Sequence, residues 1–223
     1  MAAFSMSHLA TAASSQPESI NTLFEPWRCT RFRSVPASEL VVYNPRTQLS
    51  QLQKSTARKP RPHFDNATLV VFVSGGCRRA TDSRDARASY GLYFGAGSLY
   101  NTSDLLDPAL PQTTACAEVE ALATALGIIR FITMRYAKFN SIKLVTDSRY
   151  LVDAMSALAP DQQKQDSVNG QLRPPAHLDR LMALRKKIEA MENDDGIICQ
   201  LWHMTEDSNA EAGNLAIEAL NRA

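Results

Sequence analysis

The sequence predicts an α/β fold in which a five-stranded mixed sheet is flanked by helices. Short runs rich in β-branched and aromatic residues alternate with longer runs of helical periodicity. Their order along the chain is three strands, a helix, a strand, helices, a strand and a helix, which favours helices packed on a mixed sheet. The chain has 223 residues, 44% of them hydrophobic, and is therefore long enough to bury a core. We expect an N-terminal extension at 1–67 and one domain at 68–223.

The first three predicted strands follow one another closely. Thr68–Val73 is an uninterrupted β-rich run that stops at Ser74-Gly75-Gly76, as is typical of a central strand. Ser89–Gly95 alternates and is expected to be the second strand of a long hairpin, and a third strand begins near Ser98–Asn101. The loop between the first two strands carries four arginines, which are Arg78, Arg79, Arg84 and Arg87.

The helices are predicted from apolar spacing. The run from Thr113 to about Tyr136 is apolar over most of its surface, which indicates a buried helix. A strand at Ser141–Thr146 follows, and Asp147-Ser148 opens a helix that reaches about Ala157. After a polar loop at 159–175, helical spacing returns at 178–191. The last strand is expected at 196–203 and the last helix at 209–223.

Residues 1–67 lack such periodicity, and we expect them to be largely flexible. Residues 1–25 are polar and rich in Ser and Ala, and 38–44 favours a short strand or docking segment. The stretch 54–62 is typical of a basic linker stiffened by proline, either a solvated tether or a contact for phosphates. The extension holds 8 Lys and Arg against 4 Asp and Glu, while 68–223 holds 16 against 19.

Composition excludes several classes of protein. A net charge of +1 excludes a globally basic surface, so any nucleic acid must be held by a local patch. No apolar run approaches the ~18 residues of a membrane-spanning helix, and we expect no membrane partner. The N-terminus lacks a secretory signal, so we expect an intracellular protein, cytoplasmic or nuclear, with a mitochondrial address as the alternative. The four cysteines lack the paired spacing of zinc sites.

Four motifs lie at the ends of the predicted elements. They are Val73-Ser-Gly-Gly-Cys77, Gln112-Thr-Thr-Ala-Cys-Ala-Glu-Val119, Thr146-Asp-Ser-Arg-Tyr-Leu-Val152 and Asn209-Ala-Glu-Ala-Gly-Asn-Leu-Ala216. Through them, the chain resembles the ribonuclease H family over 68–223, especially its type 1, fungal-like members. The resemblance implies a ribonuclease H-like fold that hydrolyses the RNA strand of an RNA–DNA hybrid. It also implies two magnesium or manganese ions held by four carboxylates.

Only two of those four carboxylates are present. Glu118 and Asp147 match the family's pattern, and we expect them to be the catalytic and metal-binding residues. The other two aspartates are replaced by Ser74 and Gly213. The charge of the ligands falls from about −4 to about −2, which leaves two divalent ions poorly balanced. Neighbouring acids, such as Glu211 and those at 206–207, offer no convincing replacement.

The groups that contact substrate are also reduced. The asparagines that the resemblance implies for recognition of the 2′-hydroxyl are replaced by Ala80, Thr114 and Ala115. The segment at 159–175, which corresponds to the family's basic handle, contains no Trp. We expect weak binding of a hybrid or another duplex, through six residues: Arg78, Arg79, Gln112, Thr113, Thr114 and Arg149.

Three functional hypotheses follow. The leading one is a degenerate ribonuclease H-like domain that has lost hydrolysis and retains some binding of nucleic acid. The second is an active ribonuclease H in which Glu118, Asp147 and water hold one ion. The third is a protein-interaction module on the same scaffold. As purely structural alternatives, Asp147 is typical of a helix N-cap, and Glu118 near a helix start is favoured by the helix dipole.

Overall fold

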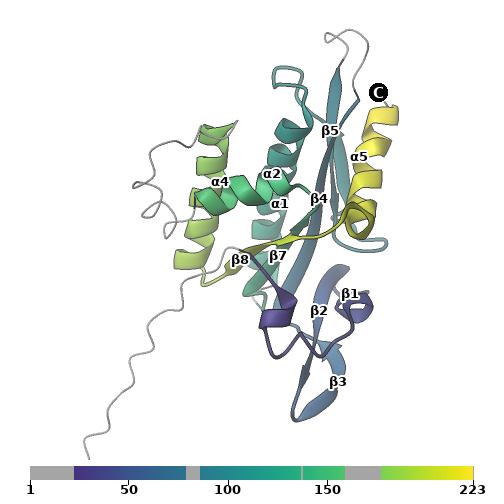
Figure 1. Cartoon of the computed structure of the whole chain (residues 1–223), viewed down its shortest axis with the longest axis vertical. Helices are drawn as coiled ribbons and strands as arrows, with labels where there is room; N and C mark the ends of the chain where they lie inside the picture. The colour runs from purple at the N-terminus through teal and green to yellow at the C-terminus, as the bar shows by residue number, and fades with distance from the viewer. Residues whose placement is uncertain (1–22, 79–85, 137, 159–176, 223) are drawn as a thin grey trace, which may run out of the picture.

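The computed structural model describes residues 23–78, 86–136, 138–158 and 177–222. They form an eight-stranded mixed sheet with helices on its faces (Figure 1). The predictions for 1–22, for Arg79 and Arg84, and for the loop at 159–175 lie outside the described residues. None of the described helices has both the length and the apolar character that crossing a bilayer requires.

Four of the five predicted strands are confirmed, and the third begins at Thr102 instead of near Ser98–Asn101; the five form the centre of the sheet. β4 (Thr68–Arg78) pairs antiparallel with β5 (Arg87–Tyr93), which pairs antiparallel with β6 (Thr102–Leu105). The other edge of β4 pairs parallel with β7 (Ser141–Thr146), which pairs parallel with β8 (Ile198–His203). Because β4 and β7 are parallel and Phe72 pairs with Val145, Ser74 and Asp147, each two residues further on, lie at the same level of the sheet.

The extension is not a flexible linker where the structure describes it. It contributes three further strands, which are β1 (Val41–Asn44), β2 (Leu49–Thr56) and β3 (Lys59–Phe64). β2 pairs with β1 and β3 and, through Ser50 and Val70, with the part of β4 that β5 leaves free. The linker predicted for 54–62 is therefore wrong. Pro60 and Pro62 favoured a linker over a strand in the prediction. An edge strand tolerates proline, however, because its unpaired side does not need the missing N–H.

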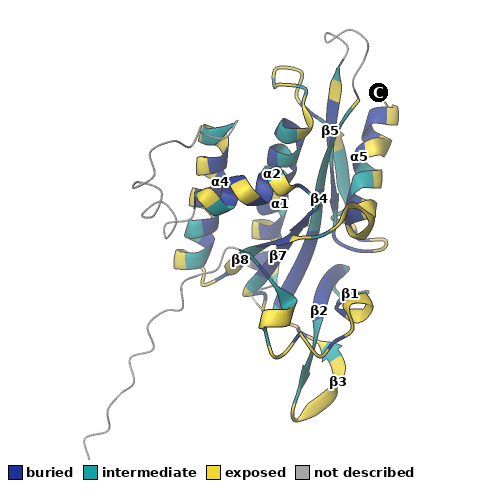
Figure 2. Ribbon diagram, in the orientation of Figure 1, coloured by how far each residue is buried: buried dark blue, intermediate teal, exposed yellow. Residues whose placement is uncertain are grey.

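Helices cover both faces of the sheet. α1 (Thr114–Arg135), α2 (Arg149–Ala157) and α4 (Leu178–Asp194) enclose the main core on one face, as the buried strands in Figure 2 show. On the opposite face, α5 (Ala210–Arg222) packs on β4, β5 and β6. The rest of that face is covered by the segment before β1, whose buried residues are Phe24, Phe32, Val35 and Leu40.

Lys143 of β7 is enclosed beneath this N-terminal segment. It is only 3% exposed, its Nζ donates a hydrogen bond to Oε1 of Gln200 at 2.5 Å, and Nζ lies 4.4 Å from the ring centroid of Phe24. Phe24 itself packs edge-on against Trp202, with ring centroids 5.1 Å apart. Burial lowers the pKa of Lys143 to about 8, because the charged ammonium loses its hydration.

Replacing Lys143 by Met is expected to raise the free energy of unfolding at pH 7 by about 2 kcal/mol. The pKa of Lys143 drops from 10.5 to about 8 on folding, so the buried charge lowers the free energy of unfolding. This destabilisation has its full size below pH 8, where Lys143 is protonated in the folded protein. That destabilisation disappears as the pH rises from about 8 to 10.5. Urea unfolding of both proteins at pH 7 and pH 10 measures the difference. A difference that does not shrink at the higher pH would contradict the assignment to the buried charge.

Candidate active site

The carboxyl ends of β4 and β7 and the starts of α1 and α5 surround a pocket of about 430 Å³. All four positions predicted to be catalytic line it: Ser74, Glu118, Asp147 and Gly213. Each comes from a different element, so the sheet and the two helices bring together residues that are up to 139 positions apart in the sequence, counting from 74 to 213.

Two glycines allow these helices to approach the sheet. A β carbon at Gly75 would lie 2.4 Å from the backbone nitrogen of Glu118, so α1 touches the backbone of β4 where Glu118 is presented. A β carbon at Gly91 would lie 2.2 Å from the backbone oxygen of Ala212, which gives α5 the same close contact with β5. No side chain larger than hydrogen fits at either position.

Ser74 and Gly213 face each other across the pocket. A β carbon at Gly213 would have Oγ of Ser74 as its only neighbour within 4 Å, at 3.9 Å. A side chain can therefore begin at Gly213 without a clash, at one of the two positions where the resemblance implies aspartate. The backbone brings Ser74 and Gly213 together, but neither of them carries the negative charge of an aspartate.

Glu118 is a partly buried carboxylate with a hydroxyl partner. Oγ of Ser148 donates a hydrogen bond to its Oε2 at 2.5 Å. Burial raises the pKa of Glu118 most, and the neighbouring charge of Asp147 raises it further, against the opposing effect of the Ser148 hydrogen bond. The two retained carboxylates thus repel each other.

Asp147 is held by Asn209, a residue of the fourth motif that sequence reasoning did not select. Nδ2 of Asn209 donates to Oδ1 of Asp147 at 2.5 Å and to the backbone oxygen of Val73 at 3.0 Å. The N-cap of α2 is Ser148, whose Oγ accepts from the backbone N–H of Leu151 at 3.1 Å. The alternative interpretation of Asp147 as the cap is therefore wrong.

These residues do not fit two divalent ions. Oxygens of Glu118 and Asp147 accept hydrogen bonds from within the chain, and Ser74 and Gly213 add no charge. Glu206 and Asp207 also line the pocket, which sequence reasoning did not expect, but both are exposed in a 3₁₀ turn, η4 (Glu206–Asn209). Within the described ranges, no group of three or more His, Cys, Asp or Glu side chains is arranged to hold a metal ion.

The residues predicted to bind nucleic acid divide into two groups. Thr114 lines the pocket and, like Arg78 and Arg149, is exposed, so these three stay predictions. Gln112 and Thr113 already have partners within the chain. Nε2 of Gln112 donates to the backbone oxygens of residues 107 and 110, its Oε1 accepts from residue 88, and Thr113 caps α1. The amide of Gln112 therefore holds the loop before α1.

Replacing Glu118 by Gln is expected to raise the melting temperature of the metal-free protein at pH 7. A folded pKa above the unfolded value of 4.5 means that the ionised carboxylate destabilises the fold at neutral pH. The stabilisation should shrink as the pH falls toward 4.5, and each kcal/mol recovered adds roughly 2–4 °C. Thermal unfolding at several pH values measures it. A lower melting temperature at pH 7 would show that the charge is compensated after all.

Comparison with solved structures identifies the fold. LC11-RNase H1, isolated from compost by a metagenomic approach, aligns over 70% of this chain and 97% of its own, with a TM-score of 0.51 and 18% sequence identity. This chain has a ribonuclease H fold. The foamy viral protease-reverse transcriptase, in a structure with an RNA/DNA hybrid, aligns over 69% of this chain and 20% of its own, with a TM-score of 0.50 and 17% identity.

The similarity establishes the ribonuclease H fold alone, because both identities are low. No protein-family model and no curated protein sequence matches the chain. Assignment to the type 1, fungal-like members stays a prediction.

Proposed function

We propose that this protein uses a ribonuclease H fold to bind nucleic acid without hydrolysing it. The observation that carries the proposal is that Gly213 faces Ser74 where the resemblance implies two aspartates, with 3.9 Å between the position of a β carbon and Oγ. Hydrolysis by two metal ions needs dense negative charge, because each ion brings +2 and prefers charged oxygen ligands. Two carboxylates provide about half of that negative charge.

Binding of nucleic acid does not need the metal-binding carboxylates that hydrolysis needs. Phosphate contacts come from exposed cations and hydroxyls, and they position a strand without any metal. Arg78 at the end of β4, Thr114 at the start of α1 and Arg149 at the start of α2 offer such groups around the pocket. The proposed function at this site is therefore weak, salt-sensitive binding of an RNA–DNA hybrid or another duplex.

The experiment uses the full chain and a hybrid with a labelled RNA strand, in millimolar magnesium or manganese. We expect binding that weakens as salt rises, and no more cleavage than the Asp147→Asn variant gives. Cleavage by the natural chain that Asp147→Asn abolishes would overturn the proposal. Absence of salt-sensitive binding would overturn it too, and would favour a protein-interaction module.

A second candidate is a nuclease with one metal ion held by Glu118, Asp147 and water. One observation favours it: Oδ1 of the buried Asn209 has no hydrogen-bond partner in the described part of the chain, and Asn209 already contacts Asp147. An ion at this place would stabilise the folded state increasingly as its concentration rises above its dissociation constant. An unchanged melting temperature in millimolar magnesium would eliminate this candidate.

A further inference from the structure

The first described segment is far more basic than the rest of the protein. Residues 23–67 contain eight Lys and Arg and three Asp and Glu. Two of the acids are paired inside the segment, Asp65 with Lys54 at 2.8 Å and Glu25 with Arg28. Glu39 is then the one remaining acid beside six cations, which are Arg31, Arg33, Arg46, Arg58, Lys59 and Arg61. All six are exposed.

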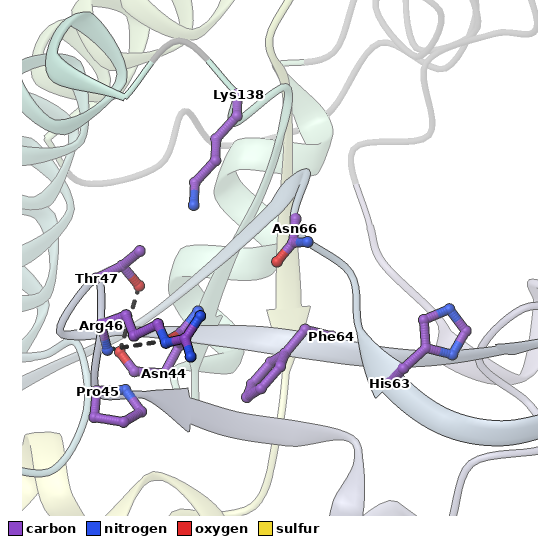
Figure 3. A pocket seen from close by; sticks show the side chains of 8 residues that line it. All are labelled: Asn44, Pro45, Arg46, Thr47, His63, Phe64, Asn66 and Lys138. Atoms are coloured by element: carbon purple, nitrogen blue, oxygen red, sulfur yellow. Dashed lines mark hydrogen bonds between the residues drawn. The ribbon is translucent and has the colours of Figure 1, made fainter.

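A groove of about 720 Å³ lies against this basic segment. It is lined by the turn between β1 and β2, by the end of β3, by Asn66, and by Lys138 from the loop between α1 and β7. In Figure 3, Arg46, Phe64 and Lys138 come from three separate parts of the chain to border the same space. Of the described residues that line the groove, none is acidic.

The side chains in the groove combine positive charge with an open aromatic ring. Arg46 and Lys138 are exposed, and neither has a described carboxylate within the 4.0 Å of an ion pair. Phe64 is 38% exposed although it is a large apolar residue. Cations that bind phosphates beside a ring that stacks on bases are typical of sites for single strands. A duplex keeps its bases stacked on each other and cannot use the ring.

β3 extends the row of cations beyond the groove. Side chains alternate along a strand, so Lys59, Arg61 and His63 share one face at intervals of roughly 6.6 Å, and Phe64 lies on the other face. β3 pairs with β2 and with no other described strand, and Figure 2 shows it largely exposed. We propose that Arg46, Phe64 and Lys138, which border the groove, form a binding surface for single-stranded RNA or DNA.

This surface is separate from the candidate active site. Asn66, at the groove, lies two residues before the start of β4, and Ser74, at the pocket, is the seventh residue of that strand. At about 3.3 Å per residue, Thr68 and Ser74 are roughly 20 Å apart along β4. The proposal therefore stands independently of the proposed function.

The test measures binding of a labelled oligouridine and a labelled oligothymidine to the full chain by fluorescence anisotropy over a range of salt concentrations. The Arg46→Ala/Lys138→Ala variant is expected to bind about tenfold more weakly, and its salt slope should fall by about 1.4, since each phosphate contact to a single strand contributes about 0.7. Phe64→Leu should weaken binding about fivefold or more with an unchanged slope. Comparison of the two oligonucleotides shows whether RNA or DNA is preferred.

The matched control is Lys186→Ala/Lys187→Ala, which removes two exposed cations from α4. It should bind within about twofold of the natural chain, because these lysines lie away from the groove. Equal weakening by both double variants would overturn the proposal in favour of a net-charge effect, as would undiminished binding by Arg46→Ala/Lys138→Ala. Preference for phosphatidylserine vesicles over both oligonucleotides would overturn it in favour of a lipid surface.

A third double variant separates this proposal from the proposed function. Arg78→Ala/Arg149→Ala removes cations near the candidate active site, and it should weaken binding of the hybrid while oligouridine binding is retained. If the oligouridine is lost with these arginines instead, single strands bind at the active-site end and the groove proposal fails.

Discussion

Changing Ser74 and Gly213 together to aspartate is expected to create metal-dependent cleavage of an RNA–DNA hybrid. A side chain can begin at Gly213 without a clash, because a β carbon there meets only Oγ of Ser74 within 4 Å among the described residues outside its own helix backbone. The change adds two carboxylates to Glu118 and Asp147 and completes the four that the resemblance implies, enough to balance two divalent ions. Each 1.4 kcal/mol by which the activation barrier falls raises the rate about tenfold. Even partial stabilisation of the transition state is therefore expected to give about a hundredfold more cleavage than background. A gel assay with labelled RNA measures it.

The controls separate the loss of ligands from the loss of substrate contacts. A variant that adds Asp147→Asn to the two aspartates should return to background. The metal-free double variant should melt at a lower temperature than the natural chain, since four close carboxylates repel, and magnesium should reverse this. If magnesium stabilises the double variant but no cleavage appears, the expectation is wrong, and the substrate-binding surface has been lost as well.

Replacing Gly75 by Ala is expected to be strongly destabilising. The added β carbon would lie 2.4 Å from the backbone nitrogen of Glu118 and 2.7 Å from the carbonyl carbon of Ala117, and neither backbone atom can rotate away. Either β4 or α1 must move. We expect a loss of about 3 kcal/mol, which lowers the melting temperature by about 10 °C.

Gly76 provides the matched control for this change. It is the next residue of β4, and its β carbon would meet the side chains of Ser89, Ala216 and Leu220 at 3.9–4.0 Å, which is ordinary van der Waals contact. Gly76→Ala should stay within about 0.5 kcal/mol of the natural chain. Thermal and urea unfolding of both variants test the pair. Equal stability of the two would show that α1 does not touch β4 as closely as described.

The central elements of the fold were predictable because their signals are local. β4 and β7 are short apolar runs, and α1 is apolar around most of its circumference, so each pattern indicates an element without knowledge of its neighbours. Glu118 and Asp147 were found through the resemblance, because each lies in a motif at the end of such an element. The structure adds the parallel pairing of β4 and β7, which brings Asp147 beside the part of β4 that holds Ser74.

β1 falls within 38–44, where a short strand was one of the two expectations, but β2 and β3 were missed because their signals are not local. Gln51 is fully buried although it is polar, and its amide donates to the backbone oxygens of Asp65 and Thr68 at 3.5 and 3.3 Å. No periodicity in the sequence reveals a polar residue whose partners are provided by another strand. Phe24 likewise becomes part of the core only through Trp202, 178 residues further on.

By itself, the sequence determined which segments are strands and helices in 68–223, and which two carboxylates remain. Apolar periodicity and residue identity are properties of single segments, and they do not depend on how the segments pack together. Only the tertiary structure decided that Ser74 faces Gly213, that Ser148 and Asn209 hold the two acids, and that a basic extension completes the sheet and borders a groove. These facts depend on distances between segments far apart in the chain, which are set by the packing of helices and strands against each other.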